Sequence, residues 1–158
     1  MTAAPPPVRS PEETARLAAE TMWASDAACR NLGIAILAVG PGTATLALTV
    51  TDTMVNGHDI AHGGYLFTLA DSAFAYACNS YGLTTVASHG SITFIRPGRR
   101  GDRLVATARE VSRSARSGLY DAQIRVGDVV IAEFRGHSRT VGGSFIDGGD
   151  PASETPTP

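Results

Sequence analysis

The sequence predicts an α+β fold in which one long helix lies inside a predominantly antiparallel sheet. The longest helical pattern in the chain runs from Gly64 to Tyr81 and has a broad apolar face. Strand-like segments follow over residues 84–141, and no helical segment separates one from the next. Because strands that do not alternate with helices favour α+β over α/β architectures, we expect an antiparallel sheet packed on this helix.

The length and composition fit one domain with a buried core. The chain has 158 residues, of which 43% are aliphatic or aromatic, and its net charge is −2. Both ends are poor in core-forming side chains, so residues 1–9 and 147–158 are predicted to be disordered tails. The remaining residues, 10–146, are expected to form a single domain.

Several classes of protein are disfavoured by the same numbers. The 13 basic and 15 acidic residues leave no basic excess for nucleic acid or an anionic membrane. No window approaches the ~20 apolar residues of a membrane span, and the first residues contain no apolar signal segment. Cys29 and Cys78 lie in apolar stretches and fit buried thiols. We expect a cytoplasmic protein without nucleic-acid or membrane partners.

The first third of the chain predicts two helical segments and a hairpin. A helix start signal lies at residues 10–13, where a serine cap precedes a proline and is followed three residues later by glutamate. A second, short turn is expected to begin at Asp26 and to stop at Gly33. Residues 34–40 and 43–50 alternate in hydrophobicity around a Gly-Pro-Gly turn, which predicts two paired strands.

The long helix is expected to end at Gly82, which would serve as its C′ glycine. Beyond it, alternating segments predict strands, with a tight turn at Gly127-Asp128 between the last two. The expected strands cover residues 84–95, 103–112, 117–126 and 129–141.

Two histidines four residues apart, His58 and His62, imitate the paired ligands of a zinc protease. That pairing requires a helix, so that both rings face one metal ion. Glycines at positions 57, 63 and 64 make a helix through this segment improbable. We therefore expect a loop over residues 51–63 and no metal site.

The paired glycines before the long helix are candidates for binding an oxyanion. The first amides of a helix have no intrahelical partner and lie at the positive end of the helix dipole. At Gly63 and Gly64 a substrate carbonyl could approach these amides closely. The alternative interpretation is a tight loop that turns under the helix.

Asp71 is unusual because it lies in an otherwise apolar helical run. A buried carboxylate is costly unless it is paired, so the residue is either catalytic, a satisfied structural aspartate or directed to solvent. It lies about 10 Å beyond the helix start at 1.5 Å per residue. One substrate carbonyl cannot easily contact both the amides at the helix start and the Asp71 carboxylate. If both features serve one reaction, two antiparallel helices must share the site between subunits.

Motifs of several other enzyme classes are absent. The sequence has no Gly-x-Ser-x-Gly elbow, no phosphate-binding loop of the Walker type and no dinucleotide-binding Gly-x-Gly-x-x-Gly. Serine hydrolases and nucleotide-cofactor enzymes are therefore not supported.

Taken together, several motifs closely resemble the phenylacetate-degradation acyl-CoA thioesterases of the hotdog-fold superfamily. The resemblance covers about residues 15–145 and rests on Asn56-Gly57-His58, His62-Gly63-Gly64, and residues 69–75, 94–98, 118–121 and 134–136. It implies a long central helix wrapped by a curved antiparallel sheet, in homodimers that share active sites and assemble into homotetramers. It also implies hydrolysis of phenylacetyl-CoA or hydroxyphenylacetyl-CoA, with no cofactor beyond the coenzyme A of the substrate.

The resemblance assigns roles to individual positions. Asp71 matches the catalytic carboxylate, and Gly63 matches the residue whose amide polarises the thioester carbonyl. Asn56 and His62 match the polar pair that orients the thioester and the water. The residues implied in binding substrate or coenzyme A are Gly64, Ala87, Ser88, His89, Arg113, Ser114, Arg116 and Ser117.

Two other functions remain open. A hotdog hydratase or dehydratase would need a histidine acting on the α,β carbons of the acyl group, whereas the candidate catalytic residue here is Asp71. A non-enzymatic module that binds acyl-CoA would not need a carboxylate beside the carbonyl.

Overall fold

The computed structural model describes residues 8–147, so the expected tails lie almost wholly outside the described part. Within it the chain forms three α-helices, one 3₁₀ turn and six strands. The elements are α1 (Pro11–Ser25), α2 (Ala27–Leu32), β1 (Ala35–Gly40), β2 (Thr43–Thr49), η1 (Asp52–Met54), α3 (Gly63–Cys78), β3 (Leu83–Phe94), β4 (Arg103–Arg113), β5 (Ser117–Val126) and β6 (Val129–Ser144).

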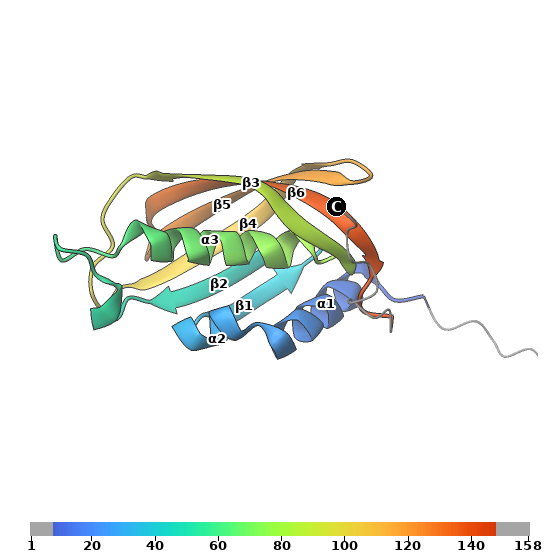
Figure 1. The fold of residues 1–158 in the computed structure, drawn as a ribbon, viewed down its shortest axis with the longest axis horizontal. Coiled ribbons are helices and arrows are strands. Elements are labelled where there is room, and N and C mark those ends of the chain that lie inside the picture. Colours follow the sequence, from blue (N-terminus) through green and yellow to red (C-terminus); the bar gives the residue numbers. More distant parts are fainter. Residues whose placement is uncertain (1–7, 148–158) are drawn as a thin grey trace, which may run out of the picture.

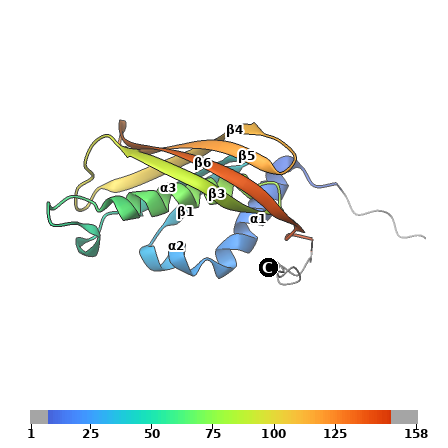
Figure 2. The same ribbon diagram turned by 45° about the horizontal axis from the view of Figure 1, so that its top comes forward.

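The strands form one antiparallel sheet in the order β1-β2-β4-β5-β6-β3. The sheet curves around α3, which lies along its concave face (Figure 1). Helices α1 and α2 lie on the side of the molecule away from β4, β5 and β6 (Figure 2). The predicted α+β fold, with a long helix wrapped by a curved sheet, is confirmed.

The core forms where small residues of α3 meet the inner face of the sheet. Leu69, Ala70 and Ala73 have no exposed surface, and neither do Leu104 and Ile124 of the facing strands. Burying a leucine or isoleucine in this way contributes about 1.5–3 kcal/mol. The alanines keep the helix close to the sheet, which fixes the position of every polar side chain that α3 carries.

The N-terminal helices follow the predicted signals. Ser10 accepts the Glu13 N–H, and the Glu13 carboxylate accepts the Ser10 N–H, so the capping box is formed. Asp26 caps α2 by accepting the Cys29 N–H at 3.0 Å, and its second oxygen accepts the Tyr76 hydroxyl at 2.9 Å. The same aspartate therefore starts α2 and attaches it to α3.

The prediction for the end of the long helix is wrong. Helix α3 stops at Cys78, and Asn79 caps it by donating its side-chain amide to the carbonyls of Ala75 and Thr85, at 3.0 and 2.8 Å. Gly82 has a φ of +75° but belongs to the following turn. The side chain of Asn79 thus binds a carbonyl of the last turn, and no glycine is needed at C′. None of the helices in residues 8–147 is long and apolar enough to cross a membrane.

Candidate active site

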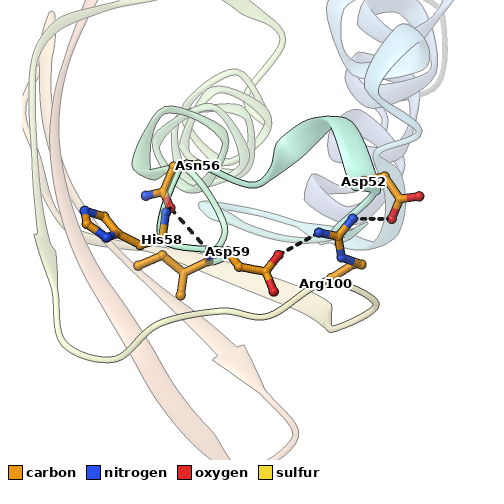
Figure 3. A network of polar contacts seen from close by, with 6 residues as sticks. Asp52, Asn56, His58, Asp59 and Arg100 are labelled. Atoms are coloured by element: carbon orange, nitrogen blue, oxygen red, sulfur yellow. Dashed lines mark hydrogen bonds and ion pairs between the residues drawn. The ribbon is translucent and has the colours of Figure 1, made fainter.

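The loop before α3 is organised by the side chain of Asn56. Its Oδ1 accepts the N–H groups of His58 and Ile60 at 2.9 and 3.4 Å, and its own N–H donates to the Ile60 carbonyl at 2.9 Å. Of the predicted loop over residues 51–63, residues 52–54 form η1 and Gly63 begins α3, whereas residues 55–62 contain no helix, so His58 and His62 do not share a helix face. Because Oδ1 is engaged by the loop, the Nδ2 group of Asn56 is left to donate elsewhere (Figure 3).

Helix α3 begins at Gly63 and is capped by His62. The His62 Nδ1 accepts the Gly64 N–H at 3.0 Å. Of the two amides suggested by the paired glycines, that of Gly64 is therefore already bound. The Gly63 N–H finds no acceptor among residues 8–147, so it can bind a ligand oxygen at the positive end of the helix.

A pocket of about 460 Å³ opens at this end of α3. Asn56 and Gly63 line it and have N–H groups without an acceptor in residues 8–147, Arg96 adds a guanidinium, and the rest of the wall is mostly apolar. The Phe94 ring stands directly over Gly63, since a Cβ atom at that position would lie 2.7 Å from its Cζ. The lining residues are Asn56, Ile60, Ala61, Gly63, Leu66, Phe94, Ile95, Arg96, Pro97 and Gly98.

Asp71 does not line this pocket. It follows Gly63 by eight residues, about 12 Å along the helix axis at 1.5 Å per residue. Its spacing from Gly64 and Thr68 places it on their face of α3, beside a second hollow of about 410 Å³ that includes His62. Within one chain, the predicted catalytic residues therefore fall into two groups: Asn56 with Gly63, and His62 with the face of Asp71.

The electrostatic environment of Asp71 is that of an unpaired carboxylate. The residue is half-buried, and its carboxylate has neither a hydrogen bond nor an ion pair within the described part of the chain. Burial raises the pKa of its carboxyl above the ordinary value of aspartate. Such a group is a stronger base than a solvated aspartate, which suits proton abstraction from water.

Strand β3 carries Ala87, Ser88 and His89 at the edge of the sheet, where all three are exposed. The pairing with β6 shifts between Ala87 and His89, and the Ser88 hydroxyl donates to the His137 carbonyl at 3.1 Å. The rings of His89 and His137 meet edge to face with centroids 5.4 Å apart.

The predicted coenzyme-A loop, residues 113–117, forms the turn between β4 and β5. It lies beside Tyr81, beyond the C-terminal end of α3, and α3 itself is about 22 Å long from Gly63 to Cys78 at 1.5 Å per residue. The Arg113 guanidinium stacks on the Tyr81 ring, 3.8 Å from its centroid, and pairs with Glu110 at 3.4 Å. The Ser114 N–H donates to the Ser117 carbonyl at 2.8 Å, which closes the turn. One chain therefore does not bring this loop to the Asn56 pocket.

The cysteines are unsuited to nucleophilic chemistry. Both are buried, and burial raises the pKa of Cys29 to about 11 and that of Cys78 to about 12, so both thiols are protonated at neutral pH. No group of three or more potential metal ligands occurs in residues 8–147.

Comparison with known proteins identifies the family. The sequence profile of the thioesterase superfamily matches residues 58–133. The acyl-coenzyme A thioesterase PaaI of Escherichia coli K12 is 47% identical over 128 residues, which cover 80% of this chain and 91% of that protein.

Solved structures agree with this comparison. The structure of E. coli PaaI, from the phenylacetic acid degradation operon, superposes with a TM-score of 0.83 at 46% identity, over 85% of this chain and 99% of that one. A mutant of the phenylacetic acid degradation protein PaaI from Thermus thermophilus gives 0.70 at 35% identity, over 72% and 97%. The chain therefore belongs to the thioesterase superfamily, and it is a thioester hydrolase with the hotdog fold of the PaaI proteins.

Proposed function

We propose that this chain hydrolyses aryl-acetyl-CoA thioesters, phenylacetyl-CoA or hydroxyphenylacetyl-CoA, to the free acid and coenzyme A. The observation that carries the proposal is the pocket at the start of α3, which combines two N–H donors with apolar walls. The aromatic acyl group would lie against Leu66, Phe94 and Pro97. Its thioester carbonyl would accept the N–H of Gly63 and the Nδ2–H of Asn56.

These two donors would stabilise the negative charge that forms on the carbonyl oxygen. When an oxygen nucleophile attacks the carbonyl carbon, the electron pair of the C=O bond moves onto that oxygen. Donors fixed in advance at this position lower the barrier, and losing one typically costs about 10²–10³-fold in turnover. The Gly63 amide also contributes the positive end of the dipole of α3.

Asp71 would supply the attacking group. Its carboxylate either removes a proton from water as water attacks the carbonyl or attacks the carbonyl carbon itself. The tetrahedral intermediate then expels the sulfur with the C–S bond pair, and the coenzyme A thiolate takes up a proton. In the second route, water hydrolyses the resulting anhydride. The raised pKa of Asp71 favours both routes because it makes the carboxylate more basic.

The distance between Gly63 and Asp71 leads us to place the reaction between two chains. Two copies of α3 packed antiparallel would bring the pocket of each chain to Asp71 of the other. The edge of β3, which pairs with no other strand within residues 8–147, offers backbone groups for this association. The same arrangement moves the partner's turn at residues 113–117 toward the pocket, where Arg113 and Arg116 would face the phosphates of coenzyme A.

We also propose an oligomeric state and a metabolic role. Two such dimers would form a homotetramer, in which β3 residues Ala87, Ser88 and His89 line the passage for the pantetheine arm. The reaction needs no cofactor because coenzyme A enters with the substrate. The names of the E. coli and Thermus relatives support a role in phenylacetate catabolism. We place this role in the cytoplasm.

The experiment is the release of free thiol from phenylacetyl-CoA, followed with a thiol reagent. Wild-type protein should release coenzyme A with turnover, and Asp71→Asn should not, although it should still bind the ester. A hydratase or dehydratase would leave the thioester intact, and a binding module would protect it. Either result would refute the proposed hydrolysis.

A further inference from the structure

The loop that carries Asn56 contains one non-glycine residue in the left-handed conformation. Asp59 has a φ of 57°, in the left-handed region that L-residues other than asparagine and aspartate rarely adopt. Its N–H donates to the Asn56 carbonyl at 2.9 Å, and Asn56 Oδ1 accepts the N–H groups of His58 and Ile60. The conformation of Asp59 and the direction of the Asn56 side chain therefore belong to one small unit.

A distant residue holds this unit from outside. Arg100, in the connection between β3 and β4, donates to Asp59 Oδ1 at 2.6 Å and to Asp52 Oδ1 at 2.7 Å (Figure 3). The turn that carries Arg100 is itself fixed, because the Arg99 N–H donates to the Asp102 carboxylate at 2.6 Å. One guanidinium thus connects η1, the Asn56 loop and the β3–β4 connection.

Arg100, Asp52 and Asp59 do not line the pocket, but they belong to the segments that form its walls. One wall is formed by the Asn56 loop and the start of α3, and the other by residues 94–98. The Ala61 N–H donates to the Gly98 carbonyl at 2.9 Å and joins the two walls. The contact between Arg100 and Asp59 is a second junction, placed at the tip of the loop.

We propose that Arg100 is a positioning residue that, through Asp59, holds the Asn56 side chain in its donating orientation. The inference rests on the proposed function for the role of Asn56, and it adds a residue outside the pocket to that site. The guanidinium does not touch the substrate. It neutralises two carboxylates and holds the left-handed turn at Asp59 in place, so that Nδ2 of Asn56 stays directed at the thioester carbonyl.

The energetics predict an effect on turnover more than on stability. The side chains of Arg100, Asp59 and Asp52 are 47, 72 and 81% exposed, and exposed ion pairs add little to the free energy of unfolding. A catalytic donor is more sensitive, because a displacement of about 1 Å can cost 10²-fold in rate. We expect a smaller displacement here, and a loss of roughly 3–10-fold.

The first test compares two exposed arginines that are neighbours in the chain. Arg100→Met removes the guanidinium and keeps the length, whereas Arg99→Met makes the same change in charge at a guanidinium that has no ion pair within residues 8–147. With phenylacetyl-CoA, Arg100→Met should lower kcat by roughly 3–10-fold, and Arg99→Met should match wild type. Both variants should keep the wild-type Tm. Equal kcat values for the two variants would overturn the inference.

The second test asks whether Arg100 acts through Asp59 and Asn56. Asp59→Asn keeps a residue that tolerates a positive φ and removes the charge, so it should reproduce Arg100→Met and add nothing to it. Asn56→Asp keeps the Oδ1 acceptor and removes the Nδ2 donor. In that background Arg100→Met should have no further effect on kcat, and a full additional loss would show that Arg100 acts elsewhere.

A third readout separates this inference from the proposed function. The amide hydrogens of His58 and Ile60, which donate to Asn56 Oδ1, should exchange faster in Arg100→Met than in Arg99→Met. This measurement does not depend on activity. If wild type released no thiol while the exchange difference was present, the proposed function would fail and the positioning role would stand. If wild type were active and the exchange rates agreed, the positioning role would fail.

Discussion

Asp71 is the residue on which the proposed chemistry depends. Asp71→Asn keeps the size of the side chain and removes its basicity, and buried Cys29 and Cys78 cannot replace it as nucleophiles. We expect turnover of phenylacetyl-CoA to fall by roughly 10²–10⁴-fold, the range of general acid–base catalysis, with binding of the ester retained. Thiol release and equilibrium binding measure the two effects. A variant with more than about a tenth of the wild-type rate would make Asp71 structural.

The same substitution should change stability in a pH-dependent way. Burial raises the folded-state pKa of Asp71, so the folded protein binds the proton more tightly than the unfolded chain. The stability that this proton confers is present at low pH and is lost as the pH rises through the raised pKa. Asp71→Asn should therefore have a higher Tm than wild type at neutral pH, and the difference should vanish in acid. Thermal unfolding from about pH 3 to pH 8 measures it, and a constant difference would contradict the unpaired carboxylate.

The φ of Gly63 is not positive, so its backbone conformation does not demand glycine. The constraint at this position is steric. A Cβ at this position would lie 2.7 Å from Cζ of Phe94, a ring that is 54% exposed and able to move. Gly63→Ala should therefore fold but displace the ring, and kcat/KM should fall by about tenfold or more. Because Phe94 also lines the pocket, the double variant is compared with Phe94→Ala alone, and in that background Gly63→Ala should cost less than in wild type. If the two losses were additive or worse, the contact with Phe94 would not be the cause.

Residue-level predictions from the sequence succeeded where the signal was local. Asp71 in an apolar helical run and the glycines before that helix were visible as patterns. The cap formed by His62 was missed, although a polar residue before Gly63 could have suggested it. The contacts of Arg100 with Asp52 and Asp59 join residues 48 and 41 positions apart, which no spacing rule connects.

At the scale of elements, the turn between β4 and β5 carries two arginines whose side-chain contacts differ. Arg113 is held on Tyr81 and Glu110, whereas the Arg116 side chain makes no ion pair within residues 8–147. Replacing both with alanine should raise KM for CoA esters and change it little for a pantetheine thioester without the nucleotide. Arg116→Ala alone should account for most of the rise. Equal effects on both substrates in steady-state assays would exclude a nucleotide contact.

The elements themselves were predictable because their periodicities are strong. Strand β5 and the turn at Gly127 lie where alternation and turn chemistry place them, and the other strands differ by a few residues at their ends. The end of α3 was mispredicted because the side chain of Asn79 bonds to Thr85, across a turn that the sequence does not reveal. The 3₁₀ turn η1 was not predicted because three residues are too few to show a repeat in hydrophobicity.

At the scale of the whole molecule, the structure separates the proposed oxyanion donors from the proposed catalytic carboxylate. Gly63 and Asp71 lie eight residues, about 12 Å, apart on one helix that packs along the concave face of the sheet (Figure 1), so one carbonyl does not reach both. The sheet ends on one side in β3, whose outer edge is unpaired within residues 8–147. The proposed reaction therefore requires a second chain, and we propose that each site is built from two copies.

The most direct measurement is complementation between two inactive variants. Asp71→Asn keeps an intact helix start, and Gly63→Val keeps an intact carboxylate, so a mixed dimer contains one wild-type site and one doubly damaged site. Random co-assembly makes about half of the dimers mixed, and activity should return to roughly a quarter of wild type, because an isologous interface contributes each patch twice. No recovery of thiol release, with mixed dimers demonstrated by mass spectrometry, would contradict a site shared between chains.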